Sequence, residues 1–457
     1  MDGVEERLTA QAAAPALADH DAARDAPGGI RSLLAMRSVR PFLTASLAFS
    51  TGTMLQAAAL GKHVYDITDS KLALGLVGLA EFLPALLLLP ITGPTADRFD
   101  RRRVGAIAAW SEGFIAVAMA VYAFSDPTSP IPLFGLAVLY GTARAFGSPA
   151  IRSLPPLIVG QRVLPRLVPL SSGTMMAGFI IGPALSGFLY DVDPAVPYLV
   201  AAALFAAGGT CLLTLRTVRA QARAATGTRS WRMAVEGLRF VRRDPILLGA
   251  VSLDMFAVLF GGAVALLPAI ADEQLGVGNV AYGWLRAAPG IGATLVTAVL
   301  ALRPARRRVG VLMFIAVSVF GLGTIALGLT NNFAVAFIAL AVLSGADAIS
   351  VFIRGVMIPL ATRDAMRGRV MAVDSVFIGA SNELGAFESG IAGQFLGVGP
   401  AVVLGGTLTL VVVGLWSVLF PELRTVDRFE EVDVERAADP VASLRRDLSN
   451  TKESTRR

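Results

Sequence analysis

The stretch GPTADRFDRRRVG, residues 93–105, separates two long apolar runs, and its last five letters return at 306–310. Both copies of RRRVG open the third apolar run in a series of six, and the second copy begins 205 positions after the first. An even number of membrane crossings returns the second half of a chain to the orientation of the first. The repeat therefore predicts two parallel halves of six helices each.

The overall composition agrees with a lipid environment. The 457-residue chain is 54% hydrophobic and only 16% charged, with a mean hydropathy of +0.65. A soluble protein needs more charge than this on its surface. The net charge of +6 does not indicate nucleic-acid binding, because the arginines form short clusters between apolar runs instead of a basic face with interleaved aromatic residues.

The apolar runs have the length of membrane spans. A bilayer core of about 30 Å needs about 20 apolar residues in a helix, and continuous apolar runs favour helices over a closed barrel. We predict an all-α membrane protein with twelve transmembrane helices, at residues 41–65, 72–95, 103–125, 131–157, 166–190, 196–216, 246–270, 281–302, 309–329, 333–360, 370–395 and 401–420.

Five segments follow from these spans. We predict a disordered cytoplasmic tail at 1–34, a six-helix half at 35–216, a cytoplasmic linker at 217–244, a second six-helix half at 245–424 and a disordered cytoplasmic tail at 425–457.

The linker itself predicts an interfacial helix, with apolar and basic side chains on opposite faces, as in a helix lying on an anionic leaflet. An ordinary solvated linker is the alternative. The apolar face would comprise Trp231, Val235, Leu238, Phe240 and Val241, and the basic face Arg232, Arg239, Arg242 and Arg243.

The basic residues also predict the orientation in the plasma membrane. Arginine clusters recur in alternate links, around 98–103, 162–166, 219–243, 303–308 and 363–369, whereas the opposite links contain only Lys71. Cytoplasmic links are the ones enriched in Lys and Arg. Both termini are therefore expected in the cytoplasm.

Several kinds of chemistry are disfavoured. One cysteine, Cys211, and two histidines, His20 and His63, are too few for a disulfide framework or a Cys- or His-based metal site. The chain contains no HExxH, no Walker A sequence and no Gly-x-Ser-x-Gly elbow in a soluble context. We therefore expect neither an enzyme nor a bound cofactor.

The loop at 93–103 resembles the loop motif of the major facilitator superfamily, Gly-x-x-x-Asp-Arg-x-Gly-Arg-Arg. The matching residues are Gly93, Asp97, Arg98, Arg101 and Arg102, while Asp100 replaces the second family glycine. This departure is similar to the branch of siderophore exporters and macrolide efflux proteins. The same resemblance is carried by the link Arg-Gly-Arg-Val at 367–370 and, in the span at 131–157, by Gly141, Phe146, Pro149, Ala150 and Pro155. The resemblance implies a conformational latch in which Asp97 binds neighbouring helix ends and arginines in one state and releases them in the other. Simple membrane anchoring is the alternative.

The fifth span is rich in small residues. Gly178, Gly182, Pro183 and Gly187 have a spacing similar to the antiporter motif of the same superfamily, with Ser186 where a glycine is usual. The resemblance implies export in exchange for a proton. Glycine-mediated packing of helices, without any transport direction, remains the alternative.

Ionisable residues inside spans suggest function, because a charge at the helix centre costs about 2.5–3.5 kcal/mol. A structural ion pair or a water-filled vestibule is the alternative for each. Glu112 and Glu388 lie closer to helix ends and are weaker candidates. The candidates for proton coupling or substrate contact are Glu81, Arg144, Asp254, Asp347, Arg354 and Glu383. For the proton, Asp347 and Glu383 come first, because they lie nearest the expected midplane of the second half.

These features together predict a secondary transporter. We expect a proton-coupled exporter of a small amphipathic molecule, such as a drug, an antibiotic or a siderophore, that functions as a monomer by alternating access. Its partners would be the substrate, the proton and membrane lipid, without nucleic acid. A transport-inactive sensor or scaffold, and an importer of a small metabolite, are the alternatives.

Overall fold

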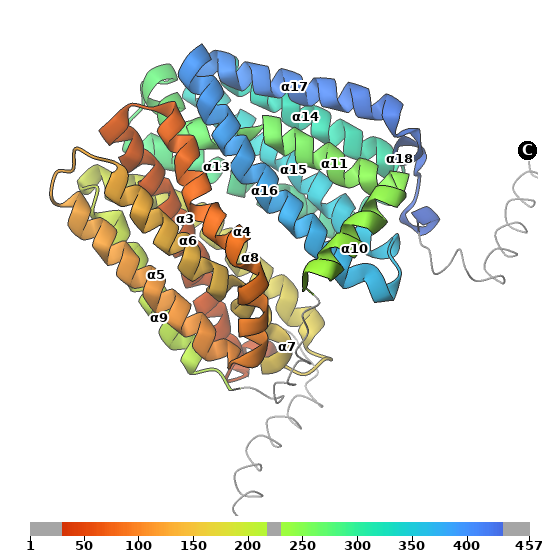
Figure 1. Ribbon diagram of the computed structural model, residues 1–457, viewed down its shortest axis with the longest axis horizontal. Helices are drawn as coiled ribbons and strands as arrows, with labels where there is room; N and C mark the ends of the chain where they lie inside the picture. Colours follow the sequence, from red (N-terminus) through yellow and green to blue (C-terminus); the bar gives the residue numbers. More distant parts are fainter. Residues whose placement is uncertain (1–29, 217–229, 433–457) are drawn as a thin grey trace, which may run out of the picture. The chain divides into compact units, whose positions relative to one another are not determined.

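The computed structural model describes residues 30–216 and 230–432, and it contains helices and turns without a strand in those two ranges (Figure 1). Most of the two predicted tails and residues 217–229 of the predicted linker lie outside the described residues. The predicted all-α class is confirmed. Two compact units divide the chain: residues 1–68 and 80–226 form the first, and residues 69–79 and 227–457 form the second. The predicted domain limits stay a prediction.

The first unit is built from six long helices and two short ones, except that residues 71–79 of α4 belong to the second unit. α3 packs along α8, and α5 packs between α6 and α9. Ala106, Leu167 and Leu212 are among the buried side chains that join these helices near one end of the unit. The elements are α2 (Ile30–Ala35), α3 (Val39–Thr68), α4 (Lys71–Arg98), α5 (Arg101–Ala123), α6 (Ile131–Arg152), α7 (Pro155–Ile158), α8 (Leu164–Val192) and α9 (Val196–Leu213).

The second unit contains the remaining elements, and in Figure 1 α14 runs beside α17 and α11 beside α16. Val309, Met313, Ile353 and Met357 belong to its core. The elements are α10 (Ser230–Arg243), α11 (Pro245–Phe260), η1 (Gly262–Leu266), α12 (Leu267–Ala269), η2 (Ile270–Gln274), α13 (Asn279–Leu302), α14 (Val309–Leu329), α15 (Phe333–Leu360), α16 (Asp364–Leu396), α17 (Val398–Leu419), α18 (Pro421–Thr425) and η3 (Phe429–Val432).

The span predicted at 246–270 is not one regular helix. α11 ends at Phe260, and the chain continues through a 3₁₀ turn, a short helical turn and a π-helical turn to Gln274. At the break, a Cβ on Gly262 would lie 2.2 Å from the carbonyl oxygen of Gly385 in α16. This close backbone approach requires glycine, so packing between helices fixes the position of the break.

Nine helical segments of the described chain are long and apolar enough to cross a membrane, by length and composition alone. The other three predicted spans coincide with α3, α6 and α16, which have 30, 22 and 33 residues but are less apolar. α3, for example, buries Ser50, Thr51 and Gln56. The count of twelve spans therefore stays a prediction.

The predicted interfacial helix of the linker corresponds to α10. Gly237 and the buried Val241 face the protein, and a Cβ on Gly237 would lie 2.8 Å from the carbonyl oxygen of Arg369. Glu236 forms an ion pair with Arg369. Val235 and Leu238 are exposed. Its location at the membrane surface stays a prediction, and the side chains of Trp231 and Arg232 lie outside the described part of the chain.

Candidate functional site

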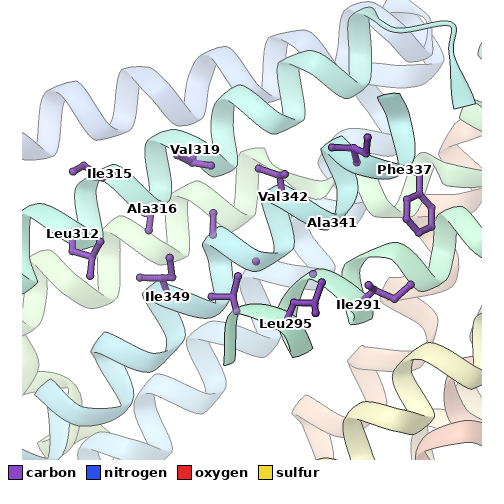
Figure 2. A pocket seen from close by; sticks show the side chains of 15 residues that line it. Ile291, Leu295, Leu312, Ile315, Ala316, Val319, Phe337, Ala341, Val342 and Ile349 are labelled. Carbon is purple, nitrogen blue, oxygen red and sulfur yellow. The ribbon is translucent and has the colours of Figure 1, made fainter. Parts of the chain in front are cut away.

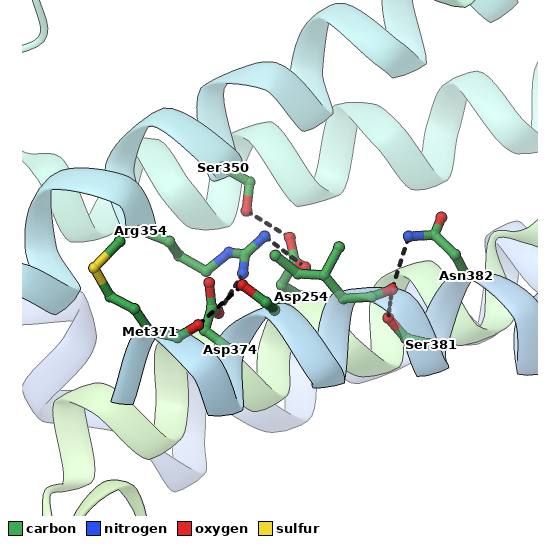
Figure 3. Close-up of polar contacts among 9 residues, drawn as sticks. Asp254, Ser350, Arg354, Met371, Asp374, Ser381 and Asn382 are labelled. Atoms are coloured by element: carbon green, nitrogen blue, oxygen red, sulfur yellow. Dashed lines mark hydrogen bonds and ion pairs between the residues drawn. The ribbon is translucent and has the colours of Figure 1, made fainter. Parts of the chain in front are cut away.

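A buried ion cluster lies inside the second unit (Figure 3). The Arg354 guanidinium of α15 places Nη2 2.7 Å from Oδ2 of Asp254 in α11, and Nη1 2.9 Å from Oδ1 of Asp374 in α16. The Ser350 hydroxyl donates a hydrogen bond of 3.0 Å to Oδ1 of Asp254. The side chain of Arg354 is 3% exposed and that of Asp254 5%. One arginine thus joins three helices through two carboxylates.

Helix geometry explains why α15 supplies this cluster. Ser350 and Arg354 are four residues apart and Asp347 is three residues before Ser350, so all three share one face of the helix. Arg354 takes its partners from α11 and α16, not from Asp347. Asp347 is partly buried and lies close enough to Asp254 and Arg354 for their charges to interact.

Asp374 is a candidate residue that the sequence reasoning missed. Its position near the start of a long, comparatively polar helix does not mark it as buried, although its side chain is only 19% exposed. The one available signal was an arginine at membrane depth, which requires compensating carboxylates. Only the packing of α11 and α16 against α15 identifies which carboxylates these are.

Glu383 lies further along α16 and is not part of the ion cluster. Its carboxylate occupies the space beside Gly78 of α4, where a Cβ would lie 2.5 Å from Oε2. Ser381 and Asn382, the residues before it, donate hydrogen bonds to the carbonyl of Ile378 within their own helix (Figure 3). Such back-bonding weakens helix regularity slightly.

A second polar cluster lies within the first unit. Arg144 of α6 places Nη1 3.7 Å from Oε2 of Glu81 in α4, and its side chain is 45% exposed. Arg144 also lies near enough to Glu112 of α5 for their charges to interact, and Glu112 is buried. The buried Tyr140 hydroxyl donates to Oγ1 of Thr53 at 3.3 Å. The structure therefore groups Glu81 and Arg144, two of the predicted candidates, with the weaker candidate Glu112.

Polar residues at the end of α3 form a cluster that the sequence did not suggest. Lys62 Nζ lies 2.5 Å from Oδ1 of Asp66, whose Oδ2 accepts a 2.6 Å hydrogen bond from Tyr190. His63 is buried with Nδ1 3.2 Å from the Tyr198 hydroxyl. In the described residues, no group of three or more His, Cys, Asp or Glu side chains could hold a metal ion.

The small residues of α8 form its contact with α3. A Cβ on Gly178 would lie 2.0 Å from Ser50 Oγ, and one on Gly182 would lie 2.6 Å from the carbonyl oxygen of Thr51. Pro183, Ser186 and Gly187 are buried beside them. These glycines let two helices pack almost backbone to backbone; an antiporter role for them stays a prediction.

The loop between α4 and α5 contains an N-cap. Oδ1 of Asp100 accepts a 2.9 Å hydrogen bond from the backbone amide of Arg102, and Oδ2 of Asp100 lies 2.7 Å from Nη2 of the Arg102 side chain. The hydrogen bond from the Arg102 side chain lowers the pKa of Asp100 below its usual value. Ser, Thr, Asp and Asn are the side chains that best cap a helix N-terminus. The departure of Asp100 from the family glycine therefore has a structural role.

The other residues of the predicted latch do not share one set of contacts in the described structure. Arg102 Nη1 donates to the carbonyl of Leu215 at 2.6 Å, and Arg101 Nη1 donates to that of Ser153 at 3.4 Å. Arg98 is exposed, and Gly93 has open space beside its Cα. Asp97 is in the last turn of α4, and its side chain lies outside the described part of the structure. The latch stays a prediction.

The second unit also contains an apolar pocket of about 460 Å³ between α13, α14 and α15 (Figure 2). Leu295, Ile315, Phe337 and Ile349 are among its lining residues, and none of the described lining residues is charged. Phe256 and Phe260 of α11 do not line this pocket and pack against the core of the unit.

Comparison with known proteins gives a consistent result. The family model described as "Transmembrane secretion effector" matches residues 32–449. The chain is 26% identical over 418 residues to the multidrug efflux pump Tap of Mycobacterium tuberculosis, covering 88% of this chain and 97% of that protein. It is 24% identical over 340 residues to the enterobactin exporter EntS of Shigella boydii, covering 72% of this chain and 80% of that protein.

Solved structures agree on the fold. The nucleoside transporter NupG superposes with a TM-score of 0.63 at 16% identity, over 84% of this chain and 99% of that one. A bacterial homologue of the lysosomal transporter Spinster superposes with a TM-score of 0.64 at 13% identity, over 88% of this chain and 98% of that one. The resemblance predicted from the loop motif is confirmed. The chain therefore belongs to the transmembrane secretion effector family of the major facilitator superfamily, and it is a multi-pass membrane transporter of small molecules, not an enzyme.

Proposed function

We propose that this protein exports a small amphipathic molecule, such as a drug, an antibiotic or a siderophore, in exchange for protons. It would act as a monomer in the plasma membrane, with both termini in the cytoplasm, and would alternate access to a central site.

The observation that best supports proton coupling is the pair of ion clusters, one within each unit. Arg354 lies with Asp254 and Asp374 in the second unit, and Arg144 lies with Glu81 and Glu112 in the first. Each cluster contains more acids than bases. Placing charges among membrane-spanning helices is costly, so such groups are typical of proton and substrate pathways. A purely structural role would require only matched pairs.

Export as the direction of transport is supported by the relatives. Tap is named a multidrug efflux pump and EntS an enterobactin exporter, and both similarities extend over most of the chain. Arg144, half-exposed at 45%, could contact an anionic group of a substrate, since a guanidinium binds carboxylate or phenolate oxygens well. Glu81, beside it, could contact a cationic group.

A deletion strain tests export. Without the gene, cells should retain at least one compound that the wild type secretes, or become several-fold more sensitive to a lipophilic dye such as ethidium, because the outward route is lost. The measurement is mass spectrometry of medium and cell extract, together with growth in the presence of the dye. The wild-type gene should restore whichever of these phenotypes the deletion shows.

The matched control compares two exchanges of a carboxylate for an amide. Glu81→Gln should fail to complement the deletion, because Glu81 lies in the ion cluster. Asp126→Asn should complement fully, since Asp126 is exposed and its φ of 48° is tolerated by asparagine. Accumulation outside the deletion cells, with depletion inside, would indicate an importer. Unchanged metabolites and sensitivity would favour a sensor or scaffold.

A further inference from the structure

The ion cluster of the second unit contains three carboxylates and one guanidinium. Asp254, Asp347 and Asp374 come from three different helices, α11, α15 and α16, and Arg354 is their shared base. If all four groups were ionised, the cluster would have a net charge of −2 at membrane depth. A surplus of buried negative charge is strongly unfavourable in a medium of low dielectric constant.

Two of the three acids are compensated by direct contacts. Asp254 and Asp374 each bind a different terminal nitrogen of Arg354, at 2.7 and 2.9 Å, and Ser350 donates to the remaining oxygen of Asp254. Charge-assisted hydrogen bonds of this length favour the ionised form of both partners. These two aspartates therefore serve as the fixed counter-ions of Arg354.

Asp347 differs from Asp254 and Asp374 in its contacts. Among the residues that the structure describes, its carboxyl group takes part in no hydrogen bond or ion pair. It is two helical turns from Arg354 on the same face of α15, and it interacts with the negative charge of Asp254. Unlike Ser350 and Arg354, Asp347 is only partly buried.

In the described part of the chain, α13, α14 and η3, which also pack against α15, bring no compensating base to Asp347. The one charged residue of α13, Arg286, donates to the carbonyl of Val264 at 2.9 Å, and α14 contains no charged residue. η3 brings only Glu430 and Glu431, which are exposed.

We infer that Asp347 is the proton-binding carboxyl of the second unit, and that Asp254, Arg354 and Asp374 form a fixed triad that positions it. The step is a simple acid dissociation: the O–H bond of the Asp347 carboxyl breaks, the proton passes to water, and no other bond changes. With Asp347 protonated the cluster has a net charge of −1, and after release it has −2. Release is therefore favoured only when water reaches the carboxylate.

This inference deepens the proposed function, since it names the group that would exchange the coupled proton. It also separates the roles of three candidates proposed from the sequence. Asp254 and Arg354 hold the helices in place, whereas Asp347 changes its protonation.

The test is an infrared measurement on the purified full chain in lipid, which needs no substrate. At neutral pH the wild-type protein should show a C=O stretching band of protonated carboxylic acid, and Asp347→Asn should lose one group's share of that band. The exposed Asp126→Asn is the matched control and should leave the band unchanged. Asp347→Glu, which keeps a carboxyl group, should retain the band if Asp347→Asn fails to fold.

A difference spectrum in which Asp347→Asn loses only ionised carboxylate, with no loss from the protonated band, would overturn the inference. Transport is scored separately with the same variants. If the band is lost in Asp347→Asn but the wild type moves no protons during transport, Asp347 binds a proton and the coupling claim alone fails. If protons are moved but the band is unaffected, another acid is the carrier.

Discussion

Replacing Arg354 with methionine should strongly destabilise the second unit. The change leaves Asp254 and Asp374 without their shared counter-ion inside the core, and removing one partner of a buried ion pair costs about 3–5 kcal/mol. The measurement is thermal unfolding of the detergent-solubilised protein, and we expect a large fall in Tm together with poor yield of folded protein.

Arg367→Met is the matched control for this prediction. Arg367 pairs with Asp364 at 2.5 Å, but its side chain is 39% exposed and that of Asp364 73%. Exposed pairs contribute about 0–1 kcal/mol, so Tm should change little. A triple variant that combines Arg354→Met with Asp254→Asn and Asp374→Asn should regain much of the lost stability. Equal Tm values for Arg354→Met and the wild type would show that the triad does not hold these helices together.

Replacing Gly182 with valine should disrupt the packing of α8 on α3. The first added carbon would lie 2.6 Å from the Thr51 carbonyl oxygen and 2.9 Å from the Leu55 amide nitrogen, and neither backbone atom can rotate away. Overpacking of a core costs about 1–3 kcal/mol and occasionally more, and we expect the upper end of this range here. Thermal unfolding and dye export in complemented cells are the measurements.

Gly173→Val in the same helix separates packing from helix propensity. A Cβ on Gly173 would meet nothing within 4 Å. Valine has the same intrinsic helix propensity at position 173 as at position 182. Gly173→Val should therefore keep nearly wild-type Tm and export. If both variants behaved alike, the close approach of α8 and α3 would not be what these glycines provide.

The limits of a span could be predicted closely from the sequence where charged or helix-capping residues mark its ends. The spans expected at 309–329 and 333–360 match α14 and α15. Arginines precede the first of these spans, and Thr330–Asn332 separates the two. Asn332 caps α15, because its side chain accepts hydrogen bonds from the amides of Ala334 and Val335. The break after Phe260 could not be predicted in this way. It depends on the approach of Gly262 to Gly385, which is remote in the sequence.

The candidate site could likewise be predicted only in part. Periodicity places Asp347, Ser350 and Arg354 on one face of a helix, but it cannot say which other helix faces them. Asp254 was a candidate on its own and Asp374 was not one, yet both bind the same guanidinium. Asp100 appeared only as a departure from a family glycine, and its N-cap geometry with Arg102 became visible in the structure. Pairings between distant helices are the part that a single sequence leaves open.

The most direct test of the proposed exchange of substrate for protons uses inverted membrane vesicles with an acidic interior. The compound that deletion cells retain is added outside, and both its uptake and the internal pH are followed. We expect uptake into vesicles that contain the protein, a matching loss of the pH gradient, and no uptake once an ionophore has collapsed that gradient. Uptake that continues at full rate after the collapse would contradict proton coupling.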